Sequence, residues 1–194
     1  RGFISRTLFY TLLAARVAEL SPRECLSVAK KIAGGMEYVA SMRIVHRDLS
    51  ARNILVGETI DDIKISDFIL ARTLAHSRYY ITYKEAFPIR WTAPEAIVIF
   101  QSIVPVKEGR ITAAADVWSF AVVMWELYTN GQEPYGEINC EELYHVLTEN
   151  YYRLAKPDKC PAEIYAKMLE CWHFDPNARP TFYELHQFLS LQMG

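Results

Sequence analysis

The spacing of apolar residues predicts a long helix near the start of the chain. Between residues 21 and 41 the apolar positions share one face of a helix, and they include Leu26, Ala29, Ala33, Met36 and Ala40. The run Ser21-Pro22-Arg23-Glu24 is typical of a helix start, because Ser caps the first amides, Pro suits the first position and Glu bonds back to the cap. We therefore predict an amphipathic helix from Ser21 to about Ser41.

The second half of the chain is also helical in pattern. Residues 116 to about 128 are apolar on nearly every side, which is typical of a buried helix. Asn130-Gly131 is expected to end that helix. Amphipathic spacing predicts three further helices, at 141–150, 162–171 and 181–192.

Short apolar runs surround a polar stretch in the first third of the chain. Ile44-Val45 precedes this stretch and Ile54-Leu55-Val56 follows it, while Ile63-Lys64-Ile65 alternates like the end of a strand. Residues 1–19 are mixed apolar and basic, and are expected to form a short helix and a loop. The predicted fold class is therefore mainly α, with short β-strands around residues 46–53.

Composition narrows the possible functions. The 194 residues suit a single domain, and an apolar share of 51% supports a sizeable core. A net charge of −2 gives no indication of binding to nucleic acid or to an anionic membrane. The four cysteines lack C-x-x-C spacing, so reduced thiols are expected. We find no run of 18 apolar residues and no signal peptide, and because the chain begins at Arg1 we expect its true N-terminus to lie upstream.

The polar stretch carries the most informative chemistry. His46-Arg47-Asp48-Leu49-Ser50-Ala51-Arg52-Asn53 has the pattern H-R-D-L-x-x-x-N, the catalytic-loop signature of protein kinases. In that pattern the Asp accepts the proton of an attacking hydroxyl, and the Asn oxygen holds Mg²⁺ on the phosphates of ATP. The alternative is that Asp48 is an ordinary surface carboxylate of a loop.

Further motifs follow in order. They are Asp67-Phe68-Ile69, close to D-F-G; Ala93-Pro94-Glu95; Asp116-Val117-Trp118-Ser119-Phe120; Cys171-Trp172; Asp175-Pro176; and Arg179-Pro180. With these motifs the chain resembles the C-terminal lobe of a protein tyrosine kinase, from about Leu20 to Leu189. The resemblance implies a partial tyrosine kinase domain over residues 1–194, with an activation segment at 67–95. We find no G-x-G-x-x-G and no V-A-I-K strand, so the N-terminal β lobe is expected to be missing from this sequence.

Specificity for tyrosine is implied by three features of the resemblance. Ser50 stands where serine/threonine kinases usually have Lys, and Arg52 lies four residues after Asp48, from where it can reach back to that carboxylate. Pro88 is expected to pack against the substrate phenol ring, and Trp91 either belongs to the same shelf or is simply buried. Within the tyrosine kinases the chain resembles both the Eph receptors and the Src-type kinases, and the sequence does not decide between them.

The resemblance assigns roles to individual residues. Asp48, Arg52 and Asn53 are the expected catalytic residues, Asn53 and Asp67 the expected Mg²⁺ ligands, and Leu55 and Asp67 the expected ATP-binding residues. Asn53 and Asp67 could instead be turn-forming residues, and Leu55 could be an ordinary core residue. The expected cofactors are ATP and Mg²⁺.

Other residues have expected regulatory or structural roles. Tyr79 or Tyr80 is the expected phosphorylation site of the activation loop, with Arg47 and Arg72 as candidate partners of the phosphate; these tyrosines could equally be plain exposed aromatics. A structural role is expected for His46, Arg47, Phe68, Glu95, Asp116 and Arg179. Among these, Glu95 and Arg179 are expected to form a buried ion pair, and Asp116 to brace the catalytic-loop backbone.

Two departures from the family pattern bear on activity. Ile69 replaces the Gly of D-F-G, and a β-branched residue adopts positive φ only as an outlier. An apolar segment at 98–108 makes the chain longer than the family pattern, and it is either an insertion that docks a partner or retained intron sequence. The intact Asp48, Asn53 and Asp67 favour an active tyrosine kinase of which this chain is a part, whereas the two departures and the missing lobe favour the alternative, a pseudokinase or scaffold. Its expected partners are protein substrates with tyrosine, ATP and the N-terminal lobe, with no nucleic acid. Its expected location is the cytoplasm, with a membrane reached only through other parts of the parent protein.

Overall fold

A computed structural model describes residues 20–57, 59–74, 88–101 and 111–194 of the chain. The helices are α2 (Pro22–Ser41), α3 (Pro94–Gln101), α4 (Ala113–Tyr128), α5 (Cys140–Thr148), α6 (Ala162–Cys171) and α7 (Phe182–Leu191). The strands are β1 (Ile44–Val45), β2 (Ile54–Val56), β3 (Ile63–Ile65) and β4 (Arg72–Thr73). Four 3₁₀ turns complete the elements: η1 (Ala51–Asn53), η2 (Phe68–Leu70), η3 (Ile89–Trp91) and η4 (Pro176–Ala178).

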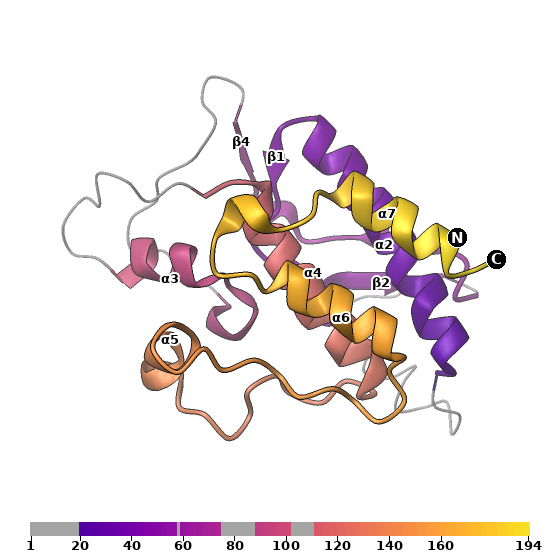
Figure 1. The fold of residues 1–194 in the computed structure, drawn as a ribbon. Helices are drawn as coiled ribbons and strands as arrows, with labels where there is room; N and C mark the ends of the chain where they lie inside the picture. The colour runs from indigo at the N-terminus through magenta and orange to yellow at the C-terminus, as the bar shows by residue number, and fades with distance from the viewer. Residues whose placement is uncertain (1–19, 58, 75–87, 102–110) are drawn as a thin grey trace.

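Helix α4 forms the centre of the core. Every residue from Ala115 to Tyr128 is buried, which explains why its sequence shows no polar face. The helices α2, α6 and α7 and the loop around residues 46–53 surround it (Figure 1). The predicted fold class, mainly helical with short strands around this loop, is confirmed.

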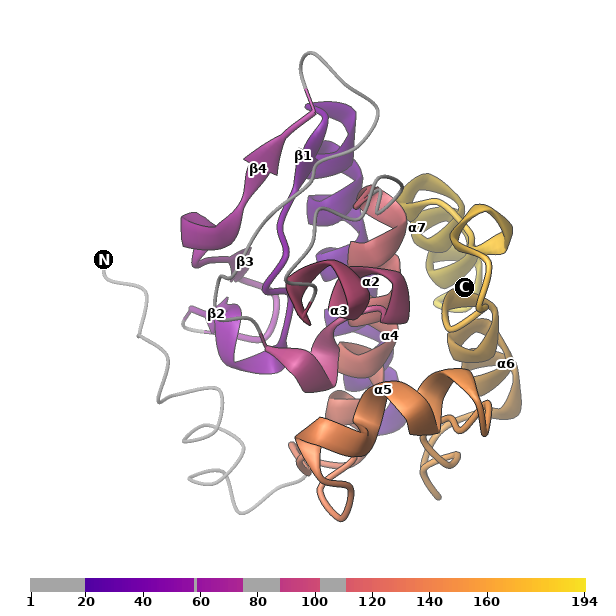
Figure 2. The same ribbon diagram turned by 90° about the vertical axis from the view of Figure 1, so that its left-hand side faces the viewer.

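The strands form two small antiparallel pairs. Strand β1 pairs with β4, and β2 pairs with β3 through Ile54 opposite Ile65 and Val56 opposite Ile63. Figure 2 shows both pairs on one side of α2 and α4, with α6 and α7 on the other side. The loop between β1 and β2 is thereby held on the side of the core opposite α6 and α7.

The predicted helix at 21–41 has the expected boundaries. Ser21 is the N-cap, Pro22 the first helical residue, and Ser21 and Glu24 form a reciprocal capping box. Inside this helix Gly34 and Gly35 allow close packing, since a Cβ on Gly34 would lie 3.2 Å from the ring of His186 in α7. Gly34 therefore lets α2 approach α7 closely, and Gly35 leaves room for Ile65 of β3, which a Cβ would meet at 3.0 Å.

Two other predicted boundaries need correction, and one helix was missed. Helix α4 begins at Ala113, three residues before Asp116, because Thr112 caps it by accepting a hydrogen bond from the Ala114 amide. Helix α5 ends at Thr148 instead of Asn150, and α3 was not predicted. Asn130 and Gly131 have φ angles of 55° and 80°, so the predicted stop after α4 is confirmed.

Several expectations lie outside the described residues. They are the helix and loop at 1–19, the tyrosines at 79 and 80, and the part of the 98–108 segment beyond residue 101. Across the described ranges, no helix is both long enough and apolar enough to cross a membrane.

Candidate active site

The loop at 46–53 is fastened to α4 by a buried carboxylate. Asp116 accepts hydrogen bonds from the backbone amides of His46, at 2.7 Å, and Arg47, at 2.9 Å. Arg47 has a φ of 71°, a strained value for a residue with a side chain. Burial raises the pKa of Asp116, although His46 and the two amides oppose that rise. The bracing contact implied by the resemblance is therefore present, and it holds the strained backbone in place.

Asp48 is held by two neighbours on the same loop, one at its carboxylate and one at its backbone amide. Its side chain forms an ion pair with the guanidinium of Arg52, four residues later. Its backbone amide donates to Nδ1 of His46 at 3.2 Å. The side chain of Asp48 remains 13% exposed. The carboxylate is thus oriented by Arg52 while still reachable by a substrate group.

His46 links the loop to the segment that carries Asp67. Because its Nδ1 accepts from the Asp48 amide, Nε2 carries the proton and donates to the carbonyl of Ser66 at 3.1 Å. The ring also meets the edge of Phe68, with centroids 4.5 Å apart. His46 and Phe68 thus pack against each other where the loop at 46–53 meets the segment that carries Asp67.

Asn53 has a side-chain oxygen that is buried and unpartnered. Its amide nitrogen donates to the carbonyl of Asp48 at 2.8 Å, whereas its Oδ1 is buried and has no hydrogen-bond partner. A buried oxygen without a partner is costly in a folded protein, and a bound cation would satisfy it. The residue fits the expected Mg²⁺ site on this ground.

The pairing of β2 with β3 brings the segment that carries Asp67 beside Asn53. Ser66 donates to the carbonyl of Asn53 from its amide, at 2.9 Å, and from its hydroxyl, at 2.8 Å. Asp67 follows at once and adopts a left-handed conformation with φ 64°. Across the described residues, no group of three or more His, Cys, Asp or Glu side chains could hold a metal. A pair of oxygen ligands completed by phosphates and water suits Mg²⁺ better than a site made of protein alone.

Ile69 is accommodated in a way that the sequence did not predict. It lies within the 3₁₀ turn η2, and Asp67, not Ile69, has the positive φ. The Ile69 side chain is 79% exposed and the Phe68 side chain 42% exposed. The replacement of Gly therefore causes no backbone strain at residue 69 itself.

Leu55 occupies a different face from its neighbours in β2. Ile54 and Val56 are buried in the core, while Leu55 is only partly buried. Alternate residues of a strand point to opposite faces. This pattern disfavours the reading of Leu55 as an ordinary core residue, and its contact with adenine stays a prediction.

Glu126 is a site residue that the sequence reasoning missed. This side chain on α4 is 1% exposed, and its Oε2 accepts from Nε1 of Trp91 at 2.8 Å and from the amide of Ala51 at 3.0 Å. Its Oε1 is buried without a partner. Burial raises the pKa of Glu126 to about 7, opposed by the bonds from Trp91 and Ala51 and by the charge of Arg52. A carboxylate among the apolar residues of the second half of α4 was the signal that could have revealed it.

Trp91 supports the catalytic loop from the activation segment. It is partly buried, bonded to Glu126, and its ring lies 4.6 Å from the guanidinium carbon of Arg52. This cation–π contact adds to the ion pair that orients Asp48. The geometry favours a supporting role for Trp91, and contact of Pro88 with a substrate ring remains a prediction.

The end of the activation segment is anchored by an ion pair. Arg179 donates two hydrogen bonds to the carboxylate of Glu95, at 2.7 and 2.9 Å, and a third to the carbonyl of Ala114 at 2.9 Å. The Arg179 side chain is fully buried and that of Glu95 is 22% exposed. Helix α3 is thereby fixed to the start of α4.

Both candidate phosphate partners donate to backbone carbonyls of the segment before β4. Arg47 donates to the carbonyl of Leu70 at 3.0 Å, and Arg72 donates to that of Ala71 at 2.9 Å. Tyr79 and Tyr80 themselves lie outside the described residues, so their relation to these arginines stays a prediction.

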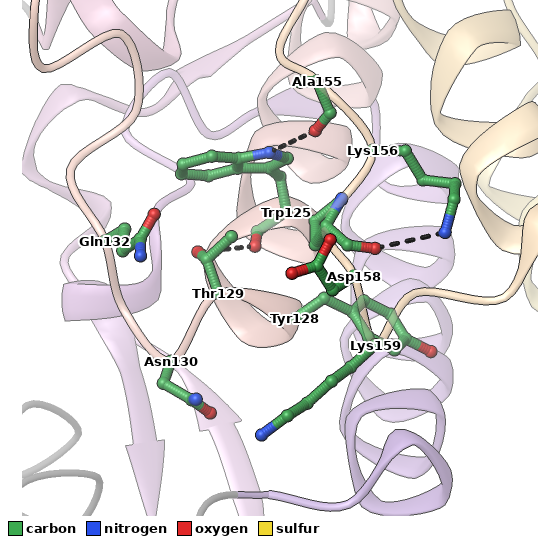
Figure 3. A pocket seen from close by; sticks show the side chains of 10 residues that line it. Trp125, Tyr128, Thr129, Asn130, Gln132, Ala155, Lys156, Asp158 and Lys159 are labelled. Carbon is green, nitrogen blue, oxygen red and sulfur yellow. Dashed lines mark hydrogen bonds between the residues drawn. The ribbon is translucent and has the colours of Figure 1, made fainter.

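A cavity of about 360 Å³ lies away from this site. It is found at the C-terminal end of α4, between Trp125, Asn130 and the segment 155–159 (Figure 3). Trp125 closes one side by donating to the carbonyl of Ala155 at 2.9 Å. None of the predicted catalytic residues lines this cavity.

Comparisons with known proteins agree with this geometry. Residues 3–189 match the protein tyrosine and serine/threonine kinase family. The chain is 44% identical to the tyrosine-protein kinase HTK16 of Hydra vulgaris over 164 residues, which cover 84% of this chain and 20% of that protein. It is 45% identical to fibroblast growth factor receptor 1 of Xenopus laevis over 168 residues, 86% of this chain and 19% of the receptor. It is 40% identical to the tyrosine-protein kinase Abl of Drosophila melanogaster over 164 residues, 84% of this chain and 9% of Abl. The chain therefore spans a fifth or less of these relatives.

Proposed function

Because this chain belongs to the protein tyrosine and serine/threonine kinase family, we propose that it is the helical lobe of a kinase that phosphorylates tyrosine in protein substrates. In this reaction the tyrosine oxygen forms a bond to the γ-phosphorus of ATP, the bond from that phosphorus to ADP breaks, and the hydroxyl proton is released. The observation that carries the proposal is the buried Oδ1 of Asn53, which has no protein partner.

Asp48 is the proposed acceptor of the hydroxyl proton. Arg52 holds its carboxylate from one side, and Trp91 and Glu126 hold Arg52 and the loop in turn. Keeping the acceptor in one orientation contributes to the rate because the reacting groups meet in productive geometry. The same arrangement supports tyrosine as the substrate, since Arg52 stands in the position that the tyrosine kinase pattern requires.

Asn53 and Asp67 are the proposed ligands of Mg²⁺. When bound, the ion would neutralise charge on the phosphates of ATP. Asn53 contributes its unpartnered Oδ1, while its amide nitrogen stays bonded to the Asp48 carbonyl. The metal ligand and the proton acceptor are therefore tied to each other through the backbone of the loop.

A phosphotransfer assay tests the proposal. The 194 residues contain no glycine-rich loop and no V-A-I-K strand, so the chain alone is expected to have negligible activity. Fused behind the small lobe of a tyrosine kinase, it is expected to phosphorylate tyrosine in a poly-Glu-Tyr polymer but not serine in casein. Asp48→Asn should lower the rate about 100- to 10,000-fold, whereas Asp158→Asn, at an exposed site, should not change it. A folded fusion that binds ATP without transfer would favour the scaffold reading instead.

Regulation and location follow as parts of the same proposal. Phosphorylation of Tyr79 or Tyr80 would add about 1.5 to 2 negative charges near Arg47 and Arg72. The domain would act in the cytoplasm, alone or as the cytoplasmic part of a receptor, since one relative is a growth factor receptor by name.

A further inference from the structure

The buried carboxyl of Glu126 joins two parts of the candidate site that are far apart in the chain. Its Oε2 accepts one hydrogen bond from the amide of Ala51, in the loop at 46–53, and one from Nε1 of Trp91, in the activation segment. Glu126 is 1% exposed, so water does not compete for these bonds. A single carboxyl oxygen of α4 therefore fastens the loop and the activation segment to the same point.

The strength of this link depends on the charge of Glu126. A hydrogen bond to an ionised acceptor is about twice as strong as one between neutral groups. Burial raises the pKa of Glu126 to about 7, although its two hydrogen bonds and the charge of Arg52 oppose that rise. Both charge states are therefore populated near neutral pH. Because Oε2 already accepts two bonds, the proton of the neutral form belongs on Oε1, which is buried and has no partner.

One cation dominates the electrostatic surroundings of this carboxyl. Within the described residues, the charged side chain that acts on Glu126 is Arg52, from η1. Arg90, from η3, is instead paired with Glu133 at 3.2 Å. Burial raises the pKa of the thiols on the two helices packed against α4, and these thiols carry no charge near pH 7; they are Cys25 of α2 and Cys171 of α6. The charge of Glu126 is therefore coupled mainly to Arg52.

Arg52 carries this coupling to the proposed proton acceptor. Its guanidinium forms an ion pair with Asp48 and lies over the ring of Trp91, 4.6 Å from the ring centroid. An ionised Glu126 attracts the guanidinium and also holds Trp91 more firmly beneath it. A neutral Glu126 provides only the weaker bond to Trp91. Asp48 therefore has the better-defined orientation when Glu126 is ionised.

We propose that Glu126 is a positioning residue, whose loss of a proton tightens the hold of α4 on the loop at 46–53 and on Trp91 and, through Arg52, orients Asp48 for transfer. The part that concerns Asp48 rests on the proposed kinase function. Ionisation of Glu126 then lowers the stability of the fold but raises the rate. A residue with a merely structural role would lower both together.

Proton–nitrogen NMR of the chain tests the hold on Trp91 without any substrate. The chain has four tryptophans, and Trp91→Phe identifies the indole signal of Trp91. From pH 6 to 8 this signal should move to higher proton chemical shift with a midpoint near 7, because the ionised acceptor strengthens the bond. Glu126→Gln, which mimics the neutral carboxyl, should abolish the movement, whereas the exposed Glu137→Gln should leave it unchanged. A Trp91 signal that stays fixed, or that still moves in Glu126→Gln, would overturn the inference.

The pH dependence of kcat in the small-lobe fusion tests the effect on Asp48. From pH 6 to 8 the kcat of the wild type should rise about threefold relative to that of Glu126→Gln, at unchanged KM for the tyrosine peptide. Trp91→Phe removes a bond that lowers the pKa of Glu126, so the rise should move to higher pH. This second variant keeps the test decisive if Glu126→Gln does not fold.

The outcomes separate this inference from the kinase function. A ratio of kcat values that stays constant, or that falls with the stability as pH rises, would overturn the positioning role while leaving the kinase function intact. No transfer at any pH, with the Trp91 signal still titrating, would instead overturn the kinase function. The charge-dependent hold of Glu126 on Trp91 would then stand.

Discussion

The raised pKa of Glu126 predicts that the stability of the fold depends on pH, and one substitution isolates this dependence. Burial raises the pKa of this carboxyl from 4.5 to about 7 in the folded chain. Between these two values the native state holds a proton that the unfolded chain has released. Stability therefore falls as pH rises from 4.5 to 7 and stays low above that.

The size of the effect follows from the shift. One pKa unit corresponds to ~1.4 kcal/mol, so the whole shift amounts to roughly 3 kcal/mol, of which about 2 to 3 are lost between pH 5 and 8. Glu126→Gln removes the titration and keeps an oxygen to accept from Trp91 and Ala51. The amide nitrogen of the introduced glutamine would lack a partner at every pH. Its cost is therefore a constant offset, which leaves the pH dependence of the difference between the two proteins unchanged.

Urea unfolding at pH 5, 6, 7 and 8 measures the difference. Far-UV circular dichroism is the suitable signal, because the substitution lies beside Trp91. The free energy of unfolding of the wild type should fall by about 2 to 3 kcal/mol relative to Glu126→Gln over this range. Glu137→Gln, at an exposed position, should track the wild type. A difference between wild type and Glu126→Gln that stays constant from pH 5 to 8 would refute the reasoning.

Three further substitutions test other contacts. Glu95→Gln leaves the buried guanidinium of Arg179 without its anion and should cost about 3 kcal/mol in urea unfolding. Glu170→Gln, which breaks an exposed ion pair, should cost under ~1 kcal/mol. Equal losses in the two variants would contradict the anchoring role of Glu95. Asn53→Ala should raise the Mg²⁺ concentration needed for ATP binding at least tenfold in calorimetric titrations of the small-lobe fusion, and an unchanged requirement would remove Asn53 from the metal site. Thr181→Ala breaks the capping box with Glu184 and should lower stability by ~1 kcal/mol, whereas Ser190→Ala within the same helix should not.

The sequence predicted those helix ends that are determined by residues a few positions apart. The capping box at Ser21 and the stop at Asn130-Gly131 involve residues a few positions apart, so the sequence contains all that is needed. Helix α3 was missed because its residues are almost all apolar and show no period that separates a helix from a strand. The start of α4 was placed late because the cap at Thr112 precedes three alanines, which carry no pattern.

Long-range contacts of the site were predicted only where a motif supplied them. The resemblance implied the links from Asp116 to the loop and from Glu95 to Arg179, which join residues 69 to 84 positions apart. Nothing comparable marked Glu126, whose partners Trp91 and Ala51 lie 35 and 75 positions away. A buried carboxylate in an apolar helix indicates that partners exist, but the fold alone determines which groups they are.

The two carboxylates of α4 explain why the candidate site is built on this helix. Asp116 and Glu126 are ten residues apart, about 15 Å along the helix axis. The first holds the loop at His46 and Arg47, and the second holds it at Ala51 and reaches Trp91 of the activation segment. The proposed proton acceptor, Asp48, lies between these two attachments, so its position is set by a helix that is buried along almost its whole length. Because burial also makes both carboxylates costly to ionise, the bonds that they accept from the loop are what stabilise their charge. The orientation of the loop and the ionisation of α4 are therefore coupled, and a change in either is expected to alter the other.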